Sequence, residues 1–103
     1  MTQRIPQLVL NEITSAGTTE PVLLDYRFDQ NPVHSIAGDI ASGDTIILLV
    51  SPHPTSLASP LVDVWVTAAT YTSTTFADVF QGSWPRVKIT KTGTAGPATV
   101  YIV

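Results

Sequence analysis

The chain has 103 residues, enough for one domain with a modest hydrophobic core. Hydrophobic residues make up 44% of it and charged residues only 13%, about half the usual share, which excludes a disordered chain. The net charge of −3 and the lack of a dense run of Lys or Arg argue against nucleic-acid binding, and the absence of cysteine excludes disulfides and thiolate metal sites. Because free soluble monomers usually carry more surface charge, we expect part of this surface to be covered by another component.

No targeting or membrane-spanning segment is expected. The N-terminus lacks the apolar run of a signal peptide, and the longest apolar run, Ile46–Val50, is far too short to cross a bilayer. We therefore expect a protein that is made in the cytoplasm and does not bind a membrane.

The predicted elements are short strands joined by turns. Thr, Val and Ile dominate, and prolines and glycines interrupt the chain at short intervals. In chain order the predicted strands are Gln7–Ile13, Pro21–Phe28, Val33–Ile40, Asp44–Ser51, Leu61–Ala69, Thr74–Phe80, Trp84–Thr92 and Ala98–Val103. Residues Ala77–Phe80 could instead form one helical turn capped by Thr75. Seven or eight such strands predict an all-β fold, a single antiparallel β-sandwich that is either Ig-like or a jelly roll.

The first twenty residues form a unit of their own in the sequence. Residues 1–20 are predicted to be either the first strand of the sandwich or an arm that pairs with a neighbouring subunit. Residues 21–103 are predicted to form the sandwich domain.

Residues 22–32 combine strand and turn chemistry with no reactive group. Tyr26 and Phe28 fall on the core face of a strand, and Arg27 falls on the opposite face. Asp29, Gln30 and the following Asn-Pro end the strand, because these residues favour turns. We expect Arg27, Asp29 and Gln30 on a surface that the protein presents.

Alternation assigns faces to the later strands. Residues 46–50 are apolar on both faces, which indicates a central strand. Trp65 lies on the outer side of its strand, where it is either an exposed contact patch or part of a second covered face. The last twenty residues predict a hairpin, with a five-residue turn over 93–97. In it Arg86, Lys88 and Thr90 point outward, and the inward residues are Val87, Ile89, Ala98, Val100 and Ile102.

No arrangement of reactive residues indicates catalysis. His34 and His53 lack the spacing of a zinc site, and we expect them on a strand surface and in a loop. The possible carboxylate pairs are Asp25 with Asp29 and Asp39 with Asp44, and neither pair shows the setting that tunes an acid and a base. Residues 39–44 are better interpreted as a β-turn than as a calcium loop. We therefore expect no catalytic residue, no cofactor and no metal.

Three segments carry a resemblance to a known family. They are Leu24–Pro32, the aromatic and Thr-rich stretch Thr72–Trp84 with the strand Pro85–Ile89 that follows, and the Gly-turn segment Thr90–Val103. Together they resemble small structural proteins encoded beside bacteriophage head genes. The resemblance implies a head decoration (cement) protein, located on the capsid surface of the virion. It also implies the major capsid protein of the same phage as partner, and self-association that favours a trimer.

The sequence thus predicts a non-catalytic virion structural protein that stabilises contacts between coat subunits. The residues expected at its partner interface are Arg27, Asp29, Gln30, Trp65, Arg86 and Lys88. The alternatives are a tail or neck component of the virion, and a carbohydrate- or receptor-binding β-module that uses Trp65, Tyr71 and Trp84 as a platform.

Overall fold

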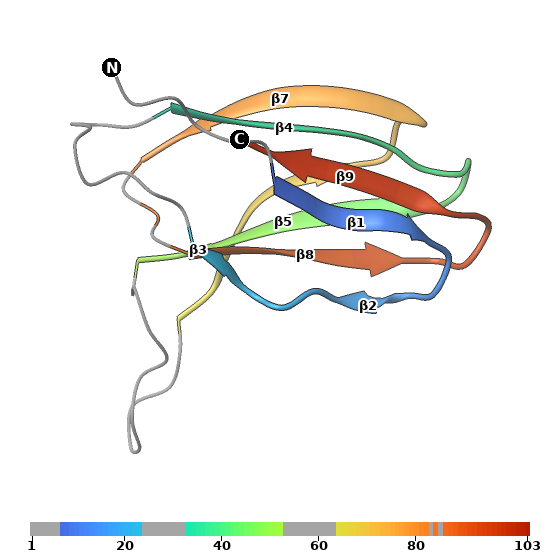
Figure 1. The fold of residues 1–103 in the computed structure, drawn as a ribbon, viewed down its shortest axis with the longest axis horizontal. Coiled ribbons are helices and arrows are strands. Elements are labelled where there is room, and N and C mark those ends of the chain that lie inside the picture. Colours follow the sequence, from blue (N-terminus) through green and yellow to red (C-terminus); the bar gives the residue numbers. More distant parts are fainter. Residues whose placement is uncertain (1–6, 24–32, 53–63, 83, 85) are drawn as a thin grey trace.

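The structure is a computed structural model, and it describes residues 7–23, 33–52, 64–82, 84 and 86–103 (Figure 1). The described residues form strands and turns. The strands are β1 (Gln7–Ile13), β2 (Gly17–Thr18), β3 (Val22–Leu23), β4 (Val33–Asp39), β5 (Thr45–Ser51), β6 (Val66–Tyr71), β7 (Thr75–Gln81), β8 (Arg86–Thr92) and β9 (Ala98–Ile102). The predicted all-β class is confirmed. The helical turn considered for Ala77–Phe80 is wrong, because these residues lie inside β7.

The strands pair in an order that runs from the two ends of the chain inward. β1 pairs with β9, β2 and β3 pair with β8, β4 pairs with β7, and β5 pairs with β6, all antiparallel. Two further pairings, β4 with β9 and β5 with β8, join these ribbons side by side. The result is a four-stranded sheet, β1-β9-β4-β7, and a five-stranded sheet, β2-β8-β5-β6 with β3 also on β8. This order of pairing is that of a jelly roll.

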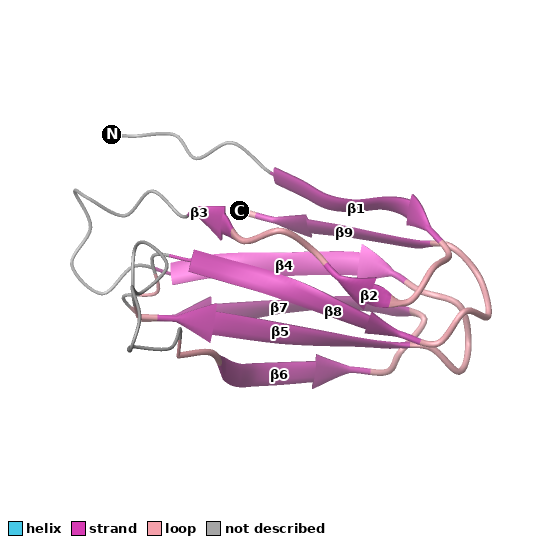
Figure 2. Ribbon diagram, turned by 90° about the horizontal axis from the view of Figure 1, so that it is seen from below, coloured by secondary structure: helices cyan, strands magenta, loops and turns pink. Residues whose placement is uncertain are grey.

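The two sheets pack face to face as a sandwich (Figures 1 and 2). β2 and β3 pair with different parts of β8, so they act as one interrupted edge strand. Residues 7–18 therefore contribute a strand to each sheet through pairing within the same chain.

The predicted hairpin over the last twenty residues is wrong. β8 belongs to the five-stranded sheet and β9 to the four-stranded sheet, so residues 93–97 cross between the sheets. β8 is already paired with β5 on one side and with β2 and β3 on the other, and it has no free edge for β9. Two alternating runs joined by a glycine turn look the same in sequence whether or not they share a sheet.

The core lies between the inner faces of the two sheets. The buried residues are Leu10, Ile36, Ile40, Ile46, Leu48, Val50, Phe76, Val87, Ile89, Ala98, Val100 and Ile102. The inward positions predicted on β8 and β9 are all buried, and β5 is a central strand as expected. Each fully buried Val, Leu or Ile contributes about 1.5–3 kcal/mol, which makes this layer the main source of stability.

Tyr71 connects the two sheets where β6 and β7 lie at their edges. Its ring stacks on Phe76 with centroids 4.6 Å apart, and its hydroxyl donates a hydrogen bond to Asp78 Oδ2 (2.9 Å). Burial raises the pKa of Tyr71, and the hydrogen bond to the Asp78 carboxylate raises it further. Asp78 faces the same way as the core residues of β4, and an inward charge on an edge strand opposes the addition of another strand there.

Candidate functional site

The outer face of the five-stranded sheet carries the residues that the sequence predicted to point outward from β8. Arg86, Lys88 and Thr90 alternate with the core residues Val87 and Ile89, so they lie on the side away from the core. The backbone of β8 is paired on both sides, with β5 and with the interrupted strand β2–β3. This strand therefore holds its outward side chains at fixed positions.

Trp65 lies over two of these side chains. Its ring centroid is 4.1 Å from Lys88 Nζ and 5.0 Å from Arg86 Cζ. Because β5 separates β6 from β8, the ring extends across the end of β5 to reach them. A cation over an indole contributes about 0.5–1 kcal/mol at an exposed site and more when water is excluded. We call Trp65, Arg86 and Lys88 the Trp65 cluster.

Arg86 is not an exposed side chain, which corrects the sequence prediction. It is only 4% exposed, and its Nη2 donates a hydrogen bond to Ser51 Oγ (3.4 Å) on β5. Trp65 and Lys88 are half-buried, so they form the accessible part of the cluster. Alternation predicts the face on which a residue lies, but it does not reveal that a ring from another part of the chain lies over it.

Three of the six predicted interface residues are therefore brought together by the fold. The other three, Arg27, Asp29 and Gln30, lie outside the described residues. The last described residue of β3, Leu23, pairs with Arg86 in the sheet.

The aromatic residues proposed as a sugar platform do not share a face. Tyr71 packs on the inner side against Phe76. Trp84 packs against the core, and its Nε1 donates a hydrogen bond to the Gln81 carbonyl oxygen (3.3 Å). Of the three, Trp65 is the one that lies over the outward side chains of β8.

The residues considered for catalysis or metal binding are separated in the fold. His34 is buried beside Phe80, with ring centroids 5.2 Å apart, so its predicted place on a strand surface is wrong. Its position follows from alternation, since it shares the inward side of β4 with Ile36. Asp39 is exposed and accepts a hydrogen bond from Thr75 Oγ1 (3.0 Å), whereas Asp44 is buried elsewhere. His53 and Asp25 lie outside the described residues.

The part of the chain that the structure describes shows neither a metal-ligand cluster nor a membrane-spanning helix. Among residues 7–23, 33–52, 64–82, 84 and 86–103, no three His, Asp or Glu side chains gather as metal ligands would. The same residues contain no helix of the length and hydropathy needed to span a bilayer.

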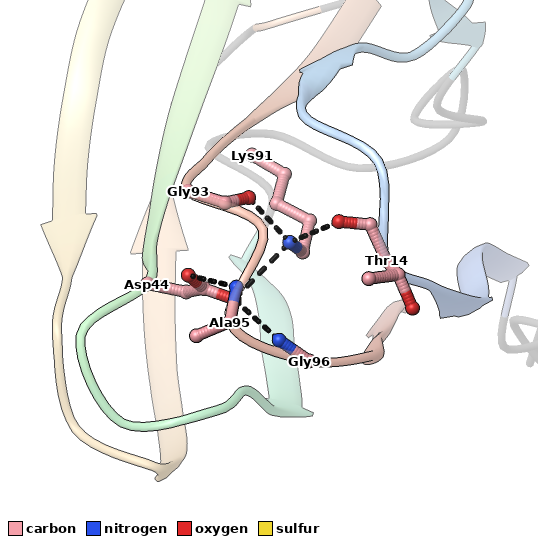
Figure 3. Close-up of polar contacts among 6 residues, drawn as sticks. All are labelled: Thr14, Asp44, Lys91, Gly93, Ala95 and Gly96. Carbon is pink, nitrogen blue, oxygen red and sulfur yellow. Dashed lines mark hydrogen bonds and ion pairs between the residues drawn. The ribbon is translucent and has the colours of Figure 1, made fainter.

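The most developed polar site is one that the sequence prediction missed. Lys91 is 1% exposed, and its Nζ donates hydrogen bonds to Asp44 Oδ2 (3.1 Å), Gly93 O (2.7 Å) and Thr14 O (2.9 Å) (Figure 3). Asp44 in turn accepts hydrogen bonds from the backbone N–H of Ala95 (3.1 Å) and Gly96 (3.4 Å). All three donors of the ammonium group are satisfied, which is the condition for burying it.

This ion pair joins three connections at one end of the sandwich. Thr14 follows β1, Asp44 ends the turn before β5, and Gly93 begins the crossing from β8 to β9. The turn before β5 is the predicted β-turn, closed by a hydrogen bond from Asp44 N to Ala41 O (3.1 Å). Gly93 has φ +89°, and a side chain there would also collide with the Asp44 carboxylate. The pair is therefore a structural clamp, which we call the Lys91–Asp44 clamp.

A signal for this clamp was present in the sequence. Lys91 follows Val87 and Ile89 at alternate positions, so alternation places it on the inward side of β8. An inward lysine needs a carboxylate partner, because an unpaired buried charge is costly. Which of the eight acidic residues supplies it depends on the sheet topology, and that is not visible in the sequence.

The clamp predicts how stability depends on pH. The backbone N–H of Ala95 lowers the pKa of Asp44 below its ordinary value of 3.8, and Lys91 and Gly96 lower it further. A lowered pKa in the folded state stabilises the fold above the unfolded-state value, and this stabilisation is lost as pH falls through the folded-state value. We therefore expect the free energy of unfolding to decrease as the pH falls below about 4.

Urea unfolding at several pH values checks this expectation. Asp44→Asn should be less stable at pH 7 and should lose less further stability on acidification than the native chain does. Glu20→Gln, which removes an exposed carboxylate, should retain the native pH dependence. If Asp44→Asn and the native chain lost the same free energy of unfolding on acidification, Asp44 would not be the source of this pH dependence.

A small hollow lies beside the clamp. Its volume is about 210 Å³, and it is lined by Leu10, Ile13, residues 15–19 and Lys91. This is below the ~300 Å³ at which ligand pockets usually begin, and the Lys91 ammonium already has three acceptors. We assign no ligand to it.

Comparison with known proteins adds no identification. No protein-family model, no curated protein and no solved structure matches this chain.

Proposed function

We propose that this protein is a non-catalytic structural component of a bacteriophage virion that binds the outside of the head through the Trp65 cluster. Its partner is the major capsid protein of the same phage, and its role is to stabilise contacts between coat subunits. The observation that carries the proposal is a half-buried tryptophan ring that lies over Arg86 and Lys88, two side chains of a strand that is paired on both sides.

Such a cluster has the chemistry of an interface centre. Tryptophan and arginine are the residues most enriched among those that dominate binding energy, and they act best when their positions are fixed before binding. Of the three cations among the described residues, Lys91 is held in the clamp and the other two lie in the cluster. The cluster is thus a local positive site on a chain of net charge −3, and it favours an acidic patch on the coat subunit.

The jelly-roll fold agrees with this role. Jelly rolls are common in viral capsids, but they also occur in lectins and enzymes. The resemblance of Leu24–Pro32 and of the C-terminal third to small head-associated proteins points to the virion. The low content of charged residues, 13%, agrees with a surface that is covered in an assembly.

The copy number in purified virions tests the proposal. We expect the chain in amounts comparable to the major capsid protein, measured by quantitative mass spectrometry against labelled standards. A copy number of about six or twelve would indicate a ring in the tail or neck instead. Absence from purified virions would contradict a virion role altogether.

A further inference from the structure

The outer face of the four-stranded sheet is apolar and exposed. Leu8 is 46% exposed, Val33 49%, Val79 63% and Tyr101 45%, although all four lie in strands. Ala37 and Ala77 lie between them at paired positions, since Ala37 pairs with both Tyr101 and Ala77, and Tyr101 also pairs with Leu8. Val103 exchanges two backbone hydrogen bonds with Ser35, which pairs with Val79. We call this surface the apolar face.

The apolar face carries almost no charge. Along β4, β7 and β9 the outward positions hold valine, alanine, serine, threonine, tyrosine and glutamine, and Asp39 is the charged exception. On β1 Glu12 is also exposed, and its backbone N–H donates a hydrogen bond to Thr99 Oγ1 (3.2 Å). Asp39 lies at one end of the face, paired with Thr75 and Thr99. The centre of this face offers no charged group to pair with a charged partner. The Trp65 cluster on the opposite sheet does, through its two cations.

We propose that the apolar face binds the same face of a second copy, forming a two-fold dimer. The proposal goes beyond the proposed function and does not depend on it. Two sheet faces of this kind pack about 10 Å apart with their strands nearly aligned, as the sheets of a sandwich do. A two-fold arrangement lets one surface serve both partners, and it replaces the trimer that the family resemblance implies.

Residues that pair across neighbouring strands form rows on the face, and these rows are compatible with a two-fold axis that runs perpendicular to the strands, in the plane between the two copies. Such an axis places the row of Tyr101, Ala37 and Ala77 opposite the row of Val103, Ser35 and Val79. Val79 of each copy then lies over the smaller Ala77 of the other, so that large and small side chains alternate. The same axis puts the two Asp39 carboxylates at opposite ends, which avoids like-charge contact.

The area of the face indicates how strong the dimer is. Four strands about 4.8 Å apart and about seven residues long at ~3.3 Å per residue cover roughly 440 Å² per copy, and two copies therefore about 900 Å². Stable specific interfaces bury about 1,200–2,000 Å², and smaller ones belong to weak complexes. We therefore expect a dimer that forms and dissociates with concentration.

Sedimentation equilibrium of the full chain over about 5–500 µM tests the proposal. The native chain should pass from the monomer mass of 11.0 kDa to twice that mass as the concentration rises. Val79→Asp and Leu8→Asp, at opposite edges of the face, should each weaken dimerisation at least tenfold, because each places a charge in the interface twice. Thr70→Asp adds the same charge on the five-stranded sheet and should dimerise like the native chain.

Far-UV circular dichroism and thermal unfolding verify that each variant is folded. A monomer mass over the whole range, a mass of three chains, or a dimer that both aspartate variants leave unchanged would each overturn the proposal.

Discussion

Replacing Lys91 with methionine should lower the free energy of unfolding by at least about 3 kcal/mol, the usual cost of breaking a buried ion pair by removing one partner. The methylene chain of methionine fills much of the same space, but three acceptors lose their donor. These are the carboxylate of Asp44 and the carbonyl oxygens of Thr14 and Gly93. For a domain of this size the loss corresponds to a fall in Tm of more than about 10 °C.

Urea unfolding followed by tryptophan fluorescence measures this effect. Lys88→Met is the matched control, because it removes a lysine from the same strand at a half-buried, outward position. It should cost no more than about 1 kcal/mol, the value of one exposed cation–π contact. If Lys91→Met unfolded at the same urea concentration as the control, the clamp would not hold the three connections together.

The two outer faces of the sandwich have different chemistry. The five-stranded sheet presents an aromatic ring with two cations, and the four-stranded sheet presents an apolar face with the acidic residues Asp39 and Glu12 at one end. A dimer through the apolar face would direct its two Trp65 clusters away from each other. The surface of one head would therefore contact one cluster of each dimer, and the other cluster would face outward.

Most of the strands could be predicted because their residues alternate. Gln7–Ile13 has the same bounds in the sequence prediction and in the structure, and β5 and β9 differ from their predicted bounds by one residue. Alternation also predicts that Ala98, Val100 and Ile102 face the core, as they do. These features depend on local sequence, which is why they could be predicted.

What could not be predicted depends on which strands pair. The sequence indicates that Trp65, Arg86 and Lys88 point outward, but their contact depends on the order β8-β5-β6 and on the ring crossing β5. The same holds for Asp44 and Lys91, which lie 47 residues apart in the chain. The separation of β8 and β9 into different sheets has the same cause, since alternation contains no information about the partner strand.

Trp65→Ala should weaken binding to heads assembled from the major capsid protein by about 2 kcal/mol or more, a roughly thirtyfold loss of affinity. The physical reason is that the ring is the largest accessible side chain of the cluster and is held in place by Arg86 and Lys88. Ile13→Ala is the control, because it truncates a side chain that is 42% exposed in the other sheet and should bind like the native chain.

Co-sedimentation of the purified chain with such heads tests the central claim most directly. We expect the native chain to saturate the heads at a copy number comparable to that of the coat subunits, with the Trp65→Ala chain folded but left in the supernatant. A native chain that fails to sediment with the heads, or a Trp65→Ala chain that binds as tightly as the native one, would contradict binding through the Trp65 cluster.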